Sequence, residues 1–271
     1  MVLIPQGFGR VGRCRGYFCS ERNGLRRSLR ANAVLFGALL FPALGYTRDF
    51  GVLIPSIHAG KLTSSVLYEY LKVREDFDTR GRAEFKSQVV GSQFTYGVTD
   101  QLAVSAKGGV ITDPQEEAQG TKWQGSAGYL YGLDLYNEVF PATGYWPGVQ
   151  ASAGATGFQV PLDRQLNSDG TVTLVDQKLS GIDYHASVLL SMKWDRFSPY
   201  TGVRLFGRSV NWHDNQSALN GDPGNIVGHA HGNASIVVGV PIRITPVVQF
   251  QAEGIFINET AVTAGFTIAA F

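Results

Sequence analysis

Two short acidic motifs carry the residues of this sequence that are best suited to acid and base chemistry. Asp76 and Asp78 form an Asp-x-Asp motif, and Asp183 and His185 form an Asp-x-His motif further along the chain. An imidazole that is oriented by a carboxylate can take a proton from water, which makes water a nucleophile. If all four side chains face one cavity, they would support hydrolysis, with His185 as the base and Asp183 orienting it.

Three histidines offer a second kind of site. His229 and His231 lie two residues apart, and His213 with Asp214 precedes them in the chain. Imidazole nitrogens are common ligands of Zn²⁺ and Cu²⁺, so these residues could bind such an ion. The alternative is a set of hydrogen-bonded histidines in a polar interior. We favour that alternative and expect neither a metal nor a cofactor.

The segments that hold these residues predict β-strands. Apolar and polar residues alternate from residue 64 onward, and Gly, Pro, Asn and Asp separate the segments. No stretch shows the 3.6-residue spacing of an amphipathic helix. We expect ten strands, at 64–78, 83–98, 101–113, 121–137, 147–161, 173–194, 198–213, 226–244, 246–258 and 261–271.

The connections between these strands fall into two sets. Those near residues 98, 140, 194 and 243 are short, whereas others, such as 112–120 and 213–225, are longer or more polar. Because the two sets alternate along the chain, they lie at opposite ends of the strands. Tight turns at one end and larger loops at the other are typical of a transmembrane β-barrel. Trp123, Trp146 and Trp194 lie near strand ends, where an aromatic girdle would place them.

The alternation indicates one apolar face and one polar face. Every even-numbered residue of 226–244 is uncharged, while the odd face carries His229, His231 and Arg243. An apolar outside and a polar inside fit a barrel in lipid. The polar residues expected to point inward are Lys107, Lys122, Asp134, Arg204, Arg208, Arg243, Gln249, Gln251 and Glu253.

These inward residues allow two interpretations. Ten strands enclose a narrow interior, and buried charges must be paired, so a hydrated network of ion pairs is one expectation. The other is a narrow conduit for small polar solutes.

The first 45 residues predict a Sec-type export signal. Three arginines precede the apolar run 33–41, and small residues follow it before an expected cleavage site at Tyr46. Residues 1–24 lengthen this signal at its front, as an upstream start codon would. Residues 46–63 fit no strand and are expected to form a periplasmic lead-in or a plug.

Removal of the signal changes the charge and the cysteine content. Residues 1–45 hold Cys14, Cys19, seven arginines and one glutamate, which leaves 16 basic and 21 acidic residues and a net charge of −5. A chain with this balance lacks the basic surface that nucleic-acid binding needs. No disulfide is expected in the exported protein.

The chain ends on an alternating segment, 261–271, whose last residue is Phe271. In this respect it resembles bacterial outer-membrane β-barrel proteins, over about residues 64–271. The resemblance implies that Phe271 is the signal for the barrel assembly machinery, and that the partners are outer-membrane lipid and lipopolysaccharide. The sequence departs from such signals because Phe266 and Ile268 take the opposite parity to the usual apolar positions.

The pairing of Asp-x-Asp with Asp-x-His also resembles the omptin proteases, which are ten-stranded barrels. That resemblance implies peptide hydrolysis at the cell surface by Asp76, Asp78, Asp183 and His185. The motifs lie on different strands from the omptin arrangement.

The sequence thus predicts an all-β fold, a closed antiparallel up-and-down transmembrane β-barrel of about ten strands in a bacterial outer membrane. Its expected role is structural, or the passage of small polar solutes. The alternatives are a barrel-borne surface hydrolase and a soluble exported β-sandwich that binds a ligand.

Overall fold

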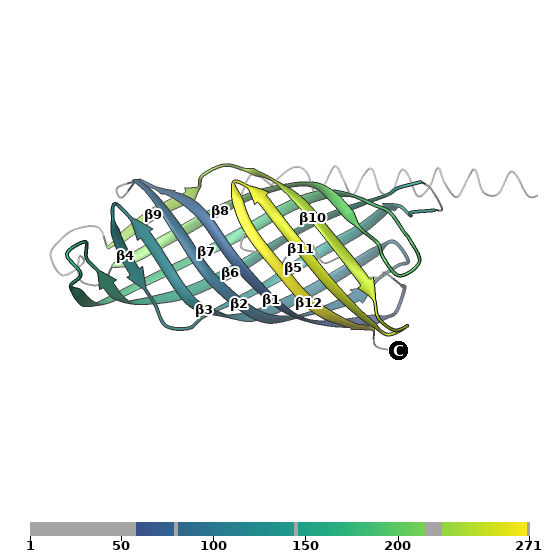
Figure 1. Ribbon diagram of the computed structural model, residues 1–271, viewed down its shortest axis with the longest axis horizontal. Helices are drawn as coiled ribbons and strands as arrows, with labels where there is room; N and C mark the ends of the chain where they lie inside the picture. The colour runs from purple at the N-terminus through teal and green to yellow at the C-terminus, as the bar shows by residue number, and fades with distance from the viewer. Residues whose placement is uncertain (1–57, 79–80, 144–145, 215–223, 270–271) are drawn as a thin grey trace, which may run out of the picture. The chain divides into compact units, whose positions relative to one another are not determined.

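The computed structural model describes residues 58–78, 81–143, 146–214 and 224–269 (Figure 1). The expected export signal with Cys14 and Cys19, the segment 46–57 and the terminal Phe271 lie outside these residues. No helix in the described part of the chain is long and apolar enough to cross a membrane.

The described chain consists of β-strands joined by turns, as the alternating pattern predicts. There are twelve strands: β1 (Leu62–Phe77), β2 (Gly81–Gly97), β3 (Leu102–Ala118), β4 (Thr121–Gln124), β5 (Gly128–Phe140), β6 (Gly148–Leu166), β7 (Val172–Ser191), β8 (Tyr200–Asp214), β9 (Asn225–Ala230), β10 (Ala234–Arg243), β11 (Val248–Ile257) and β12 (Glu259–Ala269).

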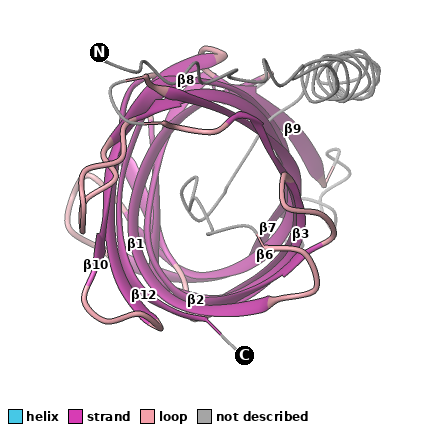
Figure 2. Ribbon diagram, turned by 90° about the vertical axis from the view of Figure 1, so that its right-hand side faces the viewer, coloured by secondary structure: helices cyan, strands magenta, loops and turns pink. Residues whose placement is uncertain are grey.

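All twelve strands belong to one sheet, and its two margins meet. The last strand, β12, pairs antiparallel with β1 from Thr63↔Ala269 to Val73↔Glu259, which closes the ring seen in Figure 2. β4 and β5 both pair with β3 and β6, and β9 and β10 both pair with β8. The two strands of each set therefore share one strand position in the barrel wall, which we call a stave. The expected closed barrel of ten staves is therefore confirmed, and the alternative of a β-sandwich is wrong.

The two ends of the barrel differ in their connections. The turns around residues 98–101, 192–199 and 244–247 lie at one end, which we call the inner end. The hairpins that join β1 to β2, β3 to β4 and β6 to β7 lie at the other end, which we call the outer end. The two sets of connections thus lie at opposite ends, as predicted. Their predicted difference in length is wrong, because the strands extend into the expected outer loops: the outer connections 119–120 and 167–171 are shorter than the inner connection 192–199.

The ring narrows toward the outer end. β12 leaves β1 at Val73, and β9 replaces it as the partner of β1 from Glu75↔Ala230 to Phe77↔Gly228. The outer ring therefore contains only β1, β2, β3, β4, β6, β7, β8 and β9, which makes eight strands against ten at the inner end. Eight strands close around an interior that side chains can fill.

The predicted strand 226–244 is interrupted at its centre. β9 ends at Ala230 and β10 begins at Ala234, with Gly232 at a φ of 101° between them. Ala230 is buried inside the barrel, but in β10 the inward residue is Val237, so the parity changes across the break. The prediction of one continuous apolar face is wrong, because an irregularity of this kind moves the following residues to the other face.

The outward surface of the wall is apolar near the inner end and charged near the outer end. On β1, Val66, Tyr68 and Tyr70 are exposed. The next outward-facing residue of β1, Lys72, forms an ion pair with Glu84 of β2 at 3.0 Å. We call the apolar zone, which includes Val66–Tyr70 and Ile182–Leu190, the lipid-facing band. Its length on β7 agrees with the ~9–11 residues that cross a bilayer as a tilted strand.

Exposed aromatic rings mark the inner edge of this band. Trp146, Trp194, Phe140 and Phe197 all lie at the inner connections with about half or more of their surface exposed. Amphipathic rings favour this level of a membrane. Trp123 does not belong to the girdle, because it is buried inside the outer end of the barrel.

Candidate functional site

An apolar core fills the outer part of the lumen. Trp212 of β8 is fully buried and makes edge-to-face contacts with Phe77 and Trp123, at centroid distances of 5.4 and 4.8 Å. Its indole nitrogen donates a hydrogen bond to Gln177 at 3.0 Å, so its one polar atom is satisfied. We call this cluster the outer plug; it comprises Leu67, Phe77, Ala83, Phe85, Val89, Ile111, Ala118, Trp123, Leu130, Phe158, Val160, Leu162, Leu179, Val210 and Trp212.

The plug extends across the whole barrel. Its members come from every strand from β1 to β8, and Ile226 of β9 packs against it. Since the outer ring consists of these strands without β5 but with β9, apolar side chains converge on the axis from all sides.

A charged layer lies next to the plug. The Arg208 guanidinium donates to Asp183 through Nε at 2.9 Å and Nη2 at 3.3 Å, and to Glu75 through Nη1 at 2.6 Å. It also lies over the ring of Phe158, 5.8 Å from the centroid. The side chains of Arg208, Asp183 and Glu75 have no exposed surface. The attraction between these charges, which come from three separate strands, offsets the free-energy cost of removing them from water.

A second buried ion pair lies between β3 and β5. Lys107 Nζ donates to Asp134 Oδ1 at 2.9 Å, and Tyr136 donates to the other oxygen of Asp134 at 3.3 Å. Gln93 in turn donates to the Tyr136 hydroxyl at 2.9 Å, which extends the network onto β2.

A third group of hydrogen bonds occupies the side formed by β8, β11 and β12. Tyr200 donates to Glu253, and Gln251 donates to the Tyr200 hydroxyl at 2.9 Å. Thr263 of β12 donates to Glu69 of β1 at 2.8 Å. The buried hydroxyls and amides thus provide hydrogen-bond partners for the buried carboxylates on this side of the lumen.

Most of the residues predicted to point inward do so. Arg204, Arg208, Lys107 and Asp134 are buried in the lumen, as are Gln251 and Glu253. Arg243 and Gln249 line a cavity at the inner end.

Lys122 is the exception among the predicted inward residues. It neighbours Trp123, which is the buried, inward residue of β4, and the side chains of adjacent strand residues point to opposite faces. The short β4, separated from β5 by residues 125–127, breaks the single parity that the sequence suggests for 121–137.

The sequence reasoning missed the inward carboxylates of β1. Glu69 and Glu75 are buried, whereas Asp76 points to the outer surface and Asp78 is exposed. The exposed apolar residues of β1 are even-numbered, so the parity of this strand already contained the signal that odd-numbered acids face inward.

The four residues of the hydrolase hypothesis therefore do not meet. Asp183 and His185 are buried in the lumen, and Asp183 is paired with Arg208. Asp76 lies on the opposite face of the wall, where its carboxylate contacts Arg82 at 3.5 Å and His231 at 2.6 Å. The Asp-x-Asp and Asp-x-His motifs therefore do not face each other across one cavity, as activation of a water by both would require.

The three histidines do not form a metal site either. His231 contacts Asp76, His213 contacts the Asn225 side chain at 2.6 Å, and His229 is paired in register with Ser209, away from His213. Within the described ranges, no three His, Cys, Asp or Glu side chains lie close enough to hold a metal ion.

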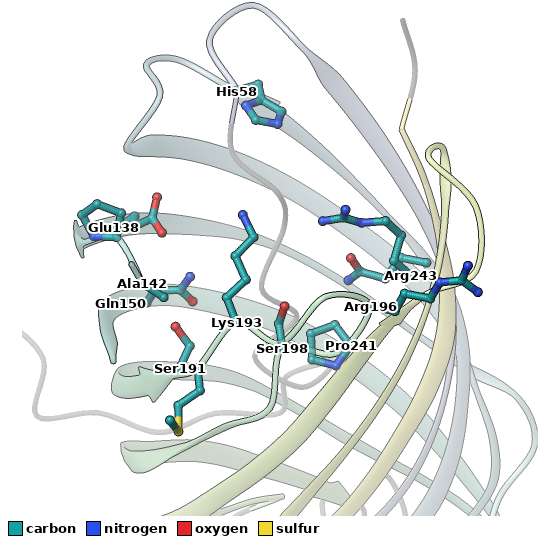
Figure 3. A pocket seen from close by; sticks show the side chains of 13 residues that line it. His58, Glu138, Ala142, Gln150, Ser191, Lys193, Arg196, Ser198, Pro241 and Arg243 are labelled. Atoms are coloured by element: carbon teal, nitrogen blue, oxygen red, sulfur yellow. The ribbon is translucent and has the colours of Figure 1, made fainter. Parts of the chain in front are cut away.

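The inner end of the lumen contains an open cavity of about 260 Å³ (Figure 3). It is lined mainly by polar and charged side chains from the inner ends of five strands and from the turns between them; those that carry charge or can do so are His58, Glu138, Lys193, Arg196 and Arg243. A second cavity of about 460 Å³ shares His58, Arg243 and Gln249 with the first. We call the two together the inner vestibule.

No protein-family model and no curated protein matches the sequence. Solved structures do share its architecture. The chain resembles bacterial outer-membrane β-barrel proteins. The outer-membrane protease OmpT of Escherichia coli is 10% identical, with a TM-score of 0.48, over 81% of this chain and 100% of OmpT.

Two further similar structures have other descriptions. The translocator domain of the autotransporter NalP of Neisseria meningitidis is 7% identical over 93% of this chain and 98% of that domain, with a TM-score of 0.47. The outer-membrane protein OprG of Pseudomonas aeruginosa is 10% identical over 80% of this chain and 99% of OprG, with a TM-score of 0.38.

Proposed function

We propose that this protein is a barrel of the bacterial outer membrane whose lumen is closed, so that its role is structural and not the passage of solutes. The observation that carries this proposal is the burial of the charged layer. The side chains of Glu75, Asp183 and Arg208 have no exposed surface. In a water-filled channel the charged side chains that line the path remain exposed to water.

The outer plug supports the same proposal. A polar solute that passed the charged layer would next meet a densely packed apolar cluster drawn from eight strands. Displacing water-excluding side chains such as Trp212 and Phe85 costs the free energy of their packing. The described residues thus leave no polar path through the outer half of the barrel.

The lipid-facing band and the girdle support a location in a membrane. A soluble protein rarely exposes a contiguous apolar surface that encircles it. Because only closed barrels and helices satisfy their backbone hydrogen bonds within lipid, a closed ring with an apolar outside suits a bilayer. Outer-membrane lipid and lipopolysaccharide are then the expected partners, and export with removal of residues 1–45 is part of the proposal.

Separation of the cell envelope on a density gradient tests the location. We expect the protein in the outer-membrane fraction, with faster migration of the unheated than of the boiled sample on a detergent gel. Recovery of a monodisperse protein in buffer without detergent would contradict the proposal.

Conductance in planar bilayers tests the closure. The wild-type barrel should give no single-channel steps. A variant that truncates both obstacles, Glu75→Ala/Asp183→Ala/Arg208→Ala/Trp212→Ala, serves as the open control, because it removes the three paired charges together with the largest fully buried side chain of the plug. Steps from the wild type that match those of the open control would refute a closed lumen.

A further inference from the structure

We infer that the inner vestibule is a binding site for a small anionic solute that carries phosphate or carboxylate groups. This goes beyond the structural role, and it rests on the closed lumen in one respect: a ligand must enter and leave at the inner end.

The charge of the vestibule favours an anion. His58, Lys61, Lys193, Arg196 and Arg243 line its two cavities. Glu138 is the one carboxylate among the described lining residues. A concave site lined by one sign of charge concentrates the field and attracts ligands of the opposite sign.

Two of these cations extend into the same space. In Figure 3 the side chains of Lys193, in the turn after β7, and Arg243, at the end of β10, both reach into the cavity, whereas Arg196 points away from it. Among the described residues neither Lys193 nor Arg243 has a carboxylate within ion-pair distance. Lys107 and Arg208 deeper in the lumen both have such partners.

The backbone around these cations is fixed before any ligand arrives. The amide of Arg243 donates to the carbonyl of Arg196 at 2.8 Å, and the amide of Ser198 donates to Pro241 at 3.1 Å. A further bridge joins Phe197 to Ile242. The turn that carries Lys193 is thus tied to the strand that carries Arg243, so binding would cost little ordering entropy of the backbone.

His58 is held over the cavity by close packing. Gly97 of β2 lies so near to it that a Cβ at this position would be 2.0 Å from the His58 carbonyl oxygen. The following turn is fixed by the amide of Gly60, which donates to the Gly97 carbonyl at 2.8 Å. Glycine is required here because any side chain would displace His58.

The size and the neutral lining residues define the ligand further. Cavities of about 260 and 460 Å³ lie near the lower end of the roughly 300–1,000 Å³ of small-molecule sites. Gln150, Gln249, Ser191 and Ser198 add hydrogen-bonding groups beside the cations. A small polyvalent anion matches this combination better than a neutral sugar or an apolar molecule.

Calorimetric titration of the folded, zwitterionic-detergent-solubilised protein with citrate and with inorganic phosphate tests the site. We expect binding of at least one probe, and the variant Lys193→Gln/Arg243→Gln should bind it at least about tenfold more weakly, since it loses two charge-assisted contacts. The control is Arg164→Gln, which removes one positive charge at the exposed outer end, against two in the double variant, and should bind like the wild type.

The remaining outcomes separate a solute site from other sources of binding. No binding of either probe, or equal binding by wild type and double variant, would overturn the inference. Citrate binding that disappears in nanodiscs of anionic phospholipid but persists in zwitterionic ones would show that lipid headgroups fill the site, which also overturns it. Because the titration needs no membrane gradient, a conducting lumen would refute the structural role and leave this result unchanged.

Discussion

Arg208 holds two carboxylates that have no access to water. Replacing it by methionine leaves Glu75 and Asp183 buried next to the outer plug without their cation. We expect Arg208→Met to lower the free energy of unfolding by about 3–5 kcal/mol, the usual cost of removing one partner of a buried ion pair. Urea unfolding of the reconstituted protein, followed by tryptophan fluorescence, measures the change.

The charge-free triple variant is the control for this effect. Glu75→Gln/Asp183→Asn/Arg208→Met should recover most of the lost stability, because the two carboxylates that Arg208 binds are neutralised together with it. Equal destabilisation of the single and the triple variant would mean that side-chain volume, and not charge, is decisive at this layer.

Gly154 makes room for the second buried ion pair. A Cβ at this position would lie 1.9 Å from Asp134 Oδ1, the atom that accepts the hydrogen bond of Lys107. Gly154→Ala should therefore destabilise the barrel by about 1–3 kcal/mol, as overpacking does. Gly108→Ala is the matched control, since its nearest neighbour would be 3.7 Å away. An unchanged unfolding midpoint for Gly154→Ala would show that Asp134 can shift at no cost.

Residue parity decided which site predictions succeeded. Lys107, Asp134 and Arg208 were predicted to face inward because their strands alternate without interruption. Lys122 was misplaced, because β4 and β5 do not share one parity. Asp76 was predicted as a site residue because of its Asp-x-Asp motif, and Glu75 was not. The exposed Tyr68 and Tyr70 show that even-numbered residues of β1 face outward.

At the scale of a strand, the lipid-facing band makes a prediction about β1. Tyr68 and Arg74 both point outward, but Tyr68 lies within the band and Arg74 lies beyond Lys72 at its outer edge. In reconstituted vesicles with the outer end outside, Arg74→Cys should react with a membrane-impermeant maleimide. Tyr68→Cys should react only after detergent dissolves the bilayer. Equal reactivity of both in intact vesicles would place the band elsewhere.

The break between β9 and β10 could not be predicted from alternation. The even-numbered residues of 226–244 are uncharged throughout, so a change of face at Gly232 leaves no trace in the pattern. The change of face follows from different strand pairing on the two sides of Gly232. β9 pairs with β1 at Glu75–Phe77, whereas β10 pairs with β11. Such pairings join segments far apart in the chain, and local pattern does not encode them.

At the scale of the whole molecule, the number of staves and the closure of the sheet were predictable, since both depend on counting alternating segments. The narrowing from ten strands to eight was not, because it depends on where β12 ends relative to β1. The outer plug follows from that narrowing, so the sequence alone left both a conduit and a filled lumen open. The vestibule likewise depends on turns that meet only after closure.

The closure of the lumen is the central claim, and osmotic water permeability tests it most directly. Purified protein is reconstituted into vesicles, and shrinkage after an osmotic jump is followed by stopped-flow light scattering. The buried charged layer and the outer plug predict the same rate as in protein-free vesicles at every protein density. A rate that rises in proportion to the amount of folded barrel would contradict a closed lumen.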